Sequence, residues 1–156
     1  MAFACTIGGD THGDLLRVGG DTVILFPVGE DPARGLFYSM SVGLSPLPTN
    51  LEYFFNVIEV VNGGGERSIF DSAEVCRIVD KESRVQILDG LLRATKYLLI
   101  NEKPKRFIMN TFVADLPEKA MVKYYMLCQL FVDCGYDVTR ANSYHGRHQW
   151  WADRRD

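Results

Sequence analysis

The stretch RFIMNTFV, residues 106–113, decides the class of fold that the sequence predicts. It is a short, almost continuously apolar run, which is typical of a strand buried inside a sheet. Predicted helices precede and follow it, so helices must pack on that sheet. The order of elements therefore predicts an α/β (α+β) fold with a mixed, mostly antiparallel sheet and two main helices.

The first of these helices is predicted over residues 81–101. Asp80 or Ser83 can cap its N-terminus, and Pro104 ends it. An apolar face at helical spacing is formed by Val85, Leu88, Leu91, Leu92, Thr95, Leu98 and Leu99. We expect this face to pack on the sheet.

The second helix has clear signals at both ends. Asp115 and Glu118 fit a capping box around Pro117, whose missing N–H costs nothing in the first turn. Gly135 supplies the left-handed residue that ends the helix. A last pair of strands is predicted within residues 136–153.

The N-terminal part of the chain is predicted to form strands joined by turns. Residues 1–20 are rich in Gly, Asp and Thr, and we interpret them as a loosely ordered arm with at most one short edge strand. β-Branched and aromatic runs predict strands over 21–28, 36–44 and 52–61. Pro27 confines the first of them to a sheet edge or a strand end.

A tight turn is predicted at Gly63–Gly65, because glycine adopts the positive backbone angles that such a turn needs. The segment 73–79 is then either the returning strand or a helical turn. The second alternative stays open because Asp71 and Glu74 fit a capping box.

The composition indicates one soluble domain, residues 1–156. The chain is 47% hydrophobic and 24% charged, as in ordinary globular proteins. Its formal net charge of -3 argues against nucleic acid as a partner. We found neither an apolar run of membrane-spanning length nor a signal peptide, so we expect a cytoplasmic protein without membrane contact.

The cysteines and histidines do not form a metal-binding pattern. The four scattered cysteines are Cys5, Cys76, Cys128 and Cys134. They form no CxxC pair, which argues against a zinc ribbon or a disulfide framework. His145 and His148 are three residues apart but lack a third ligand. We therefore predict no metal site.

Two motifs carry a resemblance to a known family. With KPKRFIMNTF after the first helix and KYYMLCQLFVDCGYDV before the last strands, the chain resembles the GNAT (N-acetyltransferase) superfamily, especially its short, divergent, phage-encoded members. Gly135-Tyr136 matches the glycine and aromatic residue that end a helix and open a strand in that family. The similarity covers roughly the last two thirds of the chain. It implies acetyl-CoA as cofactor and a primary amine as acceptor.

The resemblance also implies where the cofactor would bind. The family holds the pyrophosphate of acetyl-CoA on backbone N–H groups in a Gln/Arg-x-x-Gly-x-Gly/Ala loop at the start of the long helix. The matching stretch here, DKESRV (residues 80–85), has no glycine and two acidic residues. Ser83, Arg84 and Val85 are the cofactor-binding residues if acetyl-CoA binds, and the missing glycines predict a degenerate site.

The catalytic residues also depart from the family pattern. The family often has a tyrosine four residues before the helix-ending glycine, but this chain has Phe131 there. Tyr125 is the candidate acid that protonates the CoA thiolate, and Glu59 is the candidate base that accepts the amine proton. The usual distribution of tyrosines favours another interpretation of Tyr125, an aromatic residue that packs half-buried on the sheet with its hydroxyl group in water.

The C-terminal stretch SYHGRHQWW, residues 143–151, is the candidate partner-binding surface. Trp150 and Trp151 point to opposite faces of a strand, so one should cover the core and the other contact solvent or a partner. With Tyr144 and Arg147 they have the composition of a protein-interaction hot spot. Alternatively, the arginines here pair with nearby acidic residues as a solvated rim.

Two functions of different classes follow from the sequence. The first is a GNAT-like domain with a degenerate acetyl-CoA site that acts by binding a macromolecular partner, for which we expect a protein. The second is an active N-acetyltransferase in which Ser83 and Arg84 hold the pyrophosphate, Tyr125 is the acid and Glu59 is the base. The missing glycines favour the first.

Overall fold

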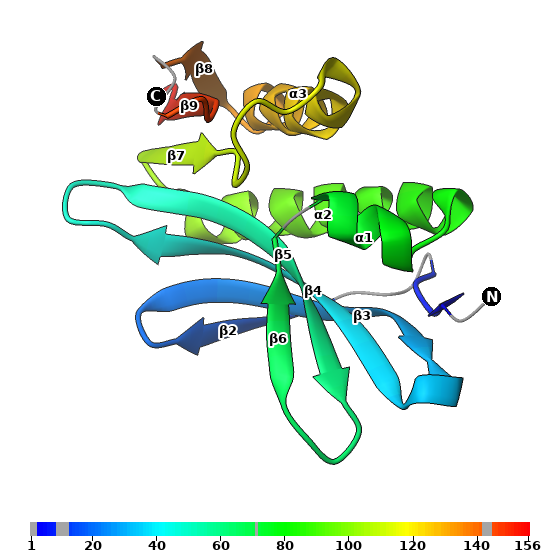
Figure 1. Cartoon of the computed structure of the whole chain (residues 1–156). Helices are drawn as coiled ribbons and strands as arrows, with labels where there is room; N and C mark the ends of the chain where they lie inside the picture. The colour runs from blue at the N-terminus through cyan, green and yellow to red at the C-terminus, as the bar shows by residue number, and fades with distance from the viewer. Residues whose placement is uncertain (1–2, 9–12, 71, 142–144) are drawn as a thin grey trace.

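The computed structural model describes residues 3–8, 13–70, 72–141 and 145–156. One mixed sheet runs through them, and three α-helices lie on one of its faces (Figure 1). The side chain of Tyr53 points to that face: its Oη lies 2.6 Å from Thr95 Oγ1 on one helix, and its ring packs edge-on against Phe131 of another. The predicted α+β class with a mixed, mostly antiparallel sheet is confirmed.

The sheet has nine strands in the order β1-β3-β4-β5-β7-β9-β8, with β2 beside β3 and β6 beside β5. The strands are β1 (Ala4–Cys5), β2 (Asp14–Val18), β3 (Asp21–Asp31), β4 (Leu36–Pro46), β5 (Leu51–Val61), β6 (Glu66–Ile69), β7 (Arg106–Asn110), β8 (Tyr136–Arg140) and β9 (Gln149–Arg154). The helices are α1 (Ser72–Ile78), α2 (Lys81–Glu102) and α3 (Glu118–Asp133). A short 3-10 helix, η1 (Pro32–Arg34), joins β3 to β4.

β5 and β7 form the one parallel pair among the described strands, and they soon diverge. Their pairing runs only from Leu51 opposite Phe107 to Tyr53 opposite Met109. β7 ends at Asn110, whereas β5 continues to Val61. Residues 57–60 of β5 pair with β6 instead. Residues 54–56 of β5 are therefore paired on the β4 side alone within the described sheet.

Pro27 lies near the middle of β3, although the sequence predicted that it would mark an edge or a strand end. The register against β4 shifts between Pro27 and Gly29, which marks a β-bulge. On its other side, β3 pairs with β2 as far as Leu25 and with β1 from Gly29. Pro27 falls between these short strands, where no ladder requires its N–H.

The N-terminal region contains more sheet than the predicted arm. Both β1 and β2 pair with β3, and they satisfy backbone N–H and C=O groups that this long strand would otherwise expose at the sheet edge. The segment after β6 forms the helix α1, so the returning strand predicted over 73–79 is wrong and the helical alternative is correct. Asp71 of the predicted capping box lies outside the described residues.

The N-terminus of α2 is capped as predicted. Asp80 has an extended backbone, and its side chain accepts a hydrogen bond from Ser83 N at 3.1 Å. The predicted apolar face packs on the sheet except at Val85, which is 66% exposed because it lies on the opposite side of the helix from the buried residues Ser83 and Ile87.

The capping box predicted for α3 does not form. Pro117 is the N-cap and has no side-chain cap bond. Asp115 instead adopts a left-handed backbone (φ 53°), and its N–H donates to Gly146 O in the C-terminal turn. The C-terminal signal of α3 is confirmed, since Gly135 has φ 100°.

Candidate functional site

A cleft of about 790 Å³ opens on the face of the sheet that carries the helices. Met40 of β4 and Val57 of β5 contribute to its floor, and its walls come from α1, the N-terminal half of α2 and the segment that leads into α3. Its size is typical of small-molecule sites, which are about 300–1,000 Å³. The divergence of β5 from β7 leaves room for it, and we treat it as the candidate site.

The cleft lining is mainly apolar and carries more positive than negative charge. The charged residues among the described lining are Arg84, Asp115, Lys119 and Lys123. Lys123 Nζ lies 5.5 Å from the ring centroid of Phe55, which also lines the cleft. The lining thus combines an apolar surface with three cationic side chains and one carboxylate.

Arg84, one of the predicted cofactor-binding residues, lies in this cleft. Its Nη1 donates to Cys76 Sγ of α1 at 2.6 Å. Its Nε is buried and has no hydrogen-bond partner within the described part of the chain. A guanidinium has five N–H donors and sulfur is a weak acceptor. Arg84 therefore has hydrogen-bonding capacity that the protein leaves unused.

The other two predicted cofactor-binding residues are not available to a phosphate. Ser83 N and Ser83 Oγ both donate to the carboxylate of Asp80, at 3.1 and 2.6 Å. These bonds, first the one from the Ser83 hydroxyl, hold the pKa of Asp80 below its usual range. The start of α2 is thus occupied by a carboxylate, where the family binds pyrophosphate. Val85 lies in solvent, outside the cleft lining.

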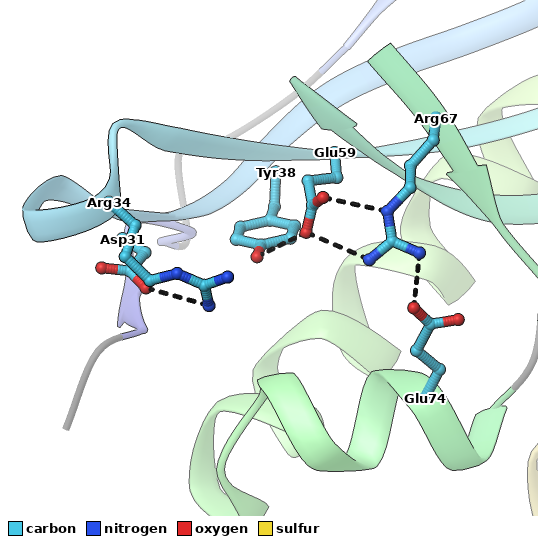
Figure 2. A network of polar contacts seen from close by, with 6 residues as sticks. All are labelled: Asp31, Arg34, Tyr38, Glu59, Arg67 and Glu74. Carbon is cyan, nitrogen blue, oxygen red and sulfur yellow. Dashed lines mark hydrogen bonds and ion pairs between the residues drawn. The ribbon is translucent and has the colours of Figure 1, made fainter. Parts of the chain in front are cut away.

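Glu59, the candidate base, belongs to a separate polar network (Figure 2). Arg67 of β6 lies between two carboxylates: its Nε donates to Glu59 at 2.9 Å and its Nη1 donates to Glu74 of α1 at 2.5 Å. Tyr38 Oη donates to the other oxygen of Glu59 at 2.8 Å. The bond from Arg67 is the main cause that lowers the pKa of Glu59. Burial, aided by the bond to Glu59, raises the pKa of Tyr38 to about 12.

This network makes Glu59 a poor general base. Its oxygens already accept hydrogen bonds from Arg67 and Tyr38, and a carboxylate with a lowered pKa takes up protons weakly. Glu59 also lies outside the cleft lining. Its evident task is to join β5 to β6 and, through Arg67, to α1.

Tyr125, the candidate acid, lies away from the cleft. It is 44% exposed and does not line the cleft. Its neighbour Tyr124 faces the sheet and stacks on Trp150 with ring centroids 5.8 Å apart. Burial raises the pKa of Tyr124 to about 12. Phe131, at the position of the family tyrosine, is buried edge-on against Phe107.

The two tryptophans of β9 take opposite faces, as predicted. Trp150 is 5% exposed and belongs to the core. It therefore offers almost no surface to a partner. Trp151 is half-buried on the other face, with the guanidinium of Arg106 5.3 Å from its ring centroid. Tyr144 lies outside the described residues.

Arg147 takes part in an aromatic stack that the sequence did not reveal. Its guanidinium lies 5.7 Å from the ring centroid of Phe112, and Phe112 stacks on Phe70 at 5.0 Å. Phe70 and Phe112 are 44% and 50% exposed, and Phe70 lines the cleft. This set, Phe70, Phe112 and Arg147, is called the aromatic rim below. Its members come from three distant segments, so no local sequence signal could have identified it.

The described residues show no metal site and no candidate membrane span. Within the described ranges, no three His, Cys, Asp or Glu side chains are grouped closely enough to hold a metal ion. None of the helices in those ranges is long and apolar enough to cross a membrane. Comparison of the chain with protein-family models, curated proteins and solved structures gave no match.

Proposed function

We propose that the chain is a GNAT-like domain with an altered acetyl-CoA site, and that it acts by binding rather than by acetyl transfer. The observation that carries this proposal is the Asp80 carboxylate, which occupies the N-terminus of α2 beside a preformed cleft. An anion held there repels the pyrophosphate that the family binds at this place.

The sheet topology supports the GNAT-like part of the proposal. The family aligns amine and thioester between two strands that separate, and β5 and β7 separate here after three paired residues. The backbone of β5 is open next to the cleft at residues 54–56. A carbonyl group of a ligand in the cleft could therefore approach backbone N–H groups of residues 54–56.

The placement of the candidate acid and base supports binding over catalysis. A general acid or base must come within hydrogen-bond reach of the reacting atoms. Neither Tyr125 nor Glu59 lines the cleft, and Glu59 is already bonded to Arg67 and Tyr38. The N-acetyltransferase alternative would therefore need other residues.

Isothermal calorimetry with acetyl-CoA tests the proposal. We expect no heat from the wild-type protein up to millimolar ligand. Asp80→Ser keeps an oxygen that can cap the helix but removes the charge, so we expect weak binding to become detectable in that variant. Micromolar binding by the wild-type protein, abolished in Arg84→Glu, would overturn the proposal and favour the N-acetyltransferase.

The aromatic rim favours a protein as the binding partner, and we propose that this partner docks there. Stacked, half-exposed phenylalanines beside an arginine are typical of interaction hot spots. The test immobilises the wild-type protein, Phe112→Ser and Tyr97→Ser, and compares the proteins that each of them retains. Tyr97→Ser is the control, because it alters an equally exposed aromatic residue on α2. We expect one partner protein to be retained by the wild-type protein and by Tyr97→Ser but not by Phe112→Ser. Once purified, this partner should bind the purified wild-type chain directly. Identical retention by all three would contradict this docking.

A further inference from the structure

The body of the cleft fits an apolar chain. The lining includes apolar side chains that are only partly buried and come from four different segments: Phe55 of β5, Phe70 after β6, Val75 of α1 and Leu88 of α2. Such a surface gains free energy when an apolar ligand displaces water from it, by roughly 25 cal/mol per Å². The ligand that uses this site must therefore carry a sizeable apolar part.

Arg84 indicates that the same ligand carries a negative charge. Its side chain lines the cleft, its Nη1 donates only to a sulfur atom, and its Nε is buried without a partner within the described residues. A partly buried guanidinium whose N–H groups lack acceptors is costly. A carboxylate ligand would supply the acceptor oxygens in a matching geometry.

The other charged residues that line the cleft also favour a negatively charged ligand. Lys119 and Lys123 line the cleft near the start of α3, and Asp115 is the one carboxylate among the described lining residues. Lys123 Nζ lies over the rings of Phe55 and Tyr124, each at 5.5 Å, so its charge is held above the aromatic wall. An anion entering the cleft thus meets three cationic side chains.

The alternatives to a singly charged amphiphile fit less well. A polyphosphate would need the N-terminus of α2, but the Asp80 carboxylate occupies it. A neutral apolar molecule would cover Arg84 and leave its Nε without an acceptor.

We infer that the ligand of the cleft is an amphipathic carboxylate: an acyl chain that lies on the apolar floor and a carboxylate head that binds Arg84. This inference rests on the proposed binding function and adds, beside a protein docked on the aromatic rim, a small-molecule ligand in the cleft. The exposed Cys76, which now accepts the bond from Arg84 Nη1, lies next to the head group in this arrangement.

Three ligands with one chain length test the inference by isothermal calorimetry: octanoate, 1-octanol and octanoyl-CoA. Octanoate and octanol share the chain and differ in the head group, so the ratio of their affinities isolates the contribution of the negative charge. We expect octanoate to bind at least about tenfold more tightly than octanol, which is the ratio that one charge-assisted hydrogen bond supplies. Octanoyl-CoA, whose thioester is neutral, should bind less tightly than octanoate.

Variants of the cleft sharpen the test. Arg84→Gln should weaken octanoate about tenfold and leave octanol unchanged, while Arg84→Lys should keep part of the preference for octanoate. Arg77→Gln is the matched control, because Arg77 is exposed on α1 and does not line the cleft. Ala120→Leu, which narrows the cleft, should weaken both ligands.

The outcomes separate this inference from the proposed function. Equal affinity for octanol and octanoate, no heat with octanoate, or octanoate binding that survives Arg84→Gln would overturn the inference while the proposed function stands. Tighter binding of octanoyl-CoA than of octanoate would overturn the head-group assignment. Micromolar binding of acetyl-CoA by the wild-type protein would contradict the proposed function itself.

Discussion

Two arginines hold the short helix α1 from opposite sides, and they do so in very different ways. Arg67 of β6 donates to Glu74 of α1 and to Glu59 of β5, both of which are carboxylates. Arg84 of α2 donates to Cys76 of α1, whose sulfur is a weak acceptor. Arg67 is fully matched in charge, whereas Arg84 is not.

The difference separates a structural arginine from one that can bind a ligand. A charge whose partners are already supplied by the fold has little to gain from a ligand. A charge with a buried N–H that lacks an acceptor among the described residues gains more from a ligand that supplies one. The network around Arg67 therefore organises the sheet and α1, and the cleft around Arg84 is where binding is favoured.

The largest effect should come from removing the centre of the structural network. Glu59→Leu deprives Arg67 of its main partner and leaves the buried Tyr38 hydroxyl without its acceptor. We expect a loss of about 2–3 kcal/mol in the free energy of unfolding, since the hydrogen bonds that Tyr38 and Arg67 donate to the Glu59 carboxylate disappear. Urea unfolding measures it. A variant as stable as the wild-type protein would show that the network is dispensable.

The same network should also contribute to the acid sensitivity of the protein. The pKa of Glu59 is lower in the folded chain than its ordinary value, so its stabilisation is complete above that value and is lost as the pH falls through the folded pKa. We expect unfolding free energy to decrease below about pH 4.5. Glu59→Gln should flatten this decrease. Parallel pH profiles of the wild-type protein and Glu59→Gln would contradict this assignment.

The elements that the sequence predicted well are those with local signals. Asp80 caps α2 through a bond to Ser83 three residues away, and Gly135 ends α3 by its own backbone angle. The long strands 36–44 and 52–61 were also recognisable, because β-branched and aromatic residues persist along each of them. In each case the deciding interaction lies within a few residues or one element.

The predictions that were wrong depended on distant contacts. The strand predicted to reach Val113 ends at Asn110, because Thr111 N donates to His148 O and Phe112 turns outward to stack on Phe70. Asp115 bonds to Gly146 instead of capping α3. These partners belong to other segments, and their positions are fixed only once the sheet has formed.

The candidate site was predicted only in part for the same reason. Arg84 was selected from a resemblance and does lie in the cleft, but its distinguishing feature, an unpartnered Nε, depends on how α1 packs on α2. Tyr125 and Tyr124 differ by one helical position, and the contact of Tyr124 with Trp150 decides which of them faces the sheet. Helical periodicity alone cannot make that choice.

Asp80 offers a smaller test of the comparison, since it is a carboxylate near Arg84 that caps a helix instead of pairing with the arginine. Asp80→Ala should lower the urea midpoint by less than Glu59→Leu does, because the cap serves one helix end and the network joins β4, β5, β6 and α1. Asp80→Ser should recover most of the urea midpoint that Asp80→Ala loses relative to the wild-type protein. Equal midpoints for Asp80→Ala and the wild-type protein would show that Ser83 N is satisfied without the cap.

The smallest expected effect has the opposite sign and concerns Arg84 itself. In Arg84→Met an apolar side chain replaces a guanidinium that forms no ion pair with the described residues, while the contact with the apolar wall is kept. We expect the free energy of unfolding to stay the same or to rise by up to about 1 kcal/mol, as is common when a residue retained for binding is replaced. Urea unfolding of Arg84→Met and of Arg77→Met, which alters an exposed arginine, checks this. A clear destabilisation confined to Arg84→Met would mean that its bond to Cys76 holds α1 in place, and the contrast between the two arginines would then be lost.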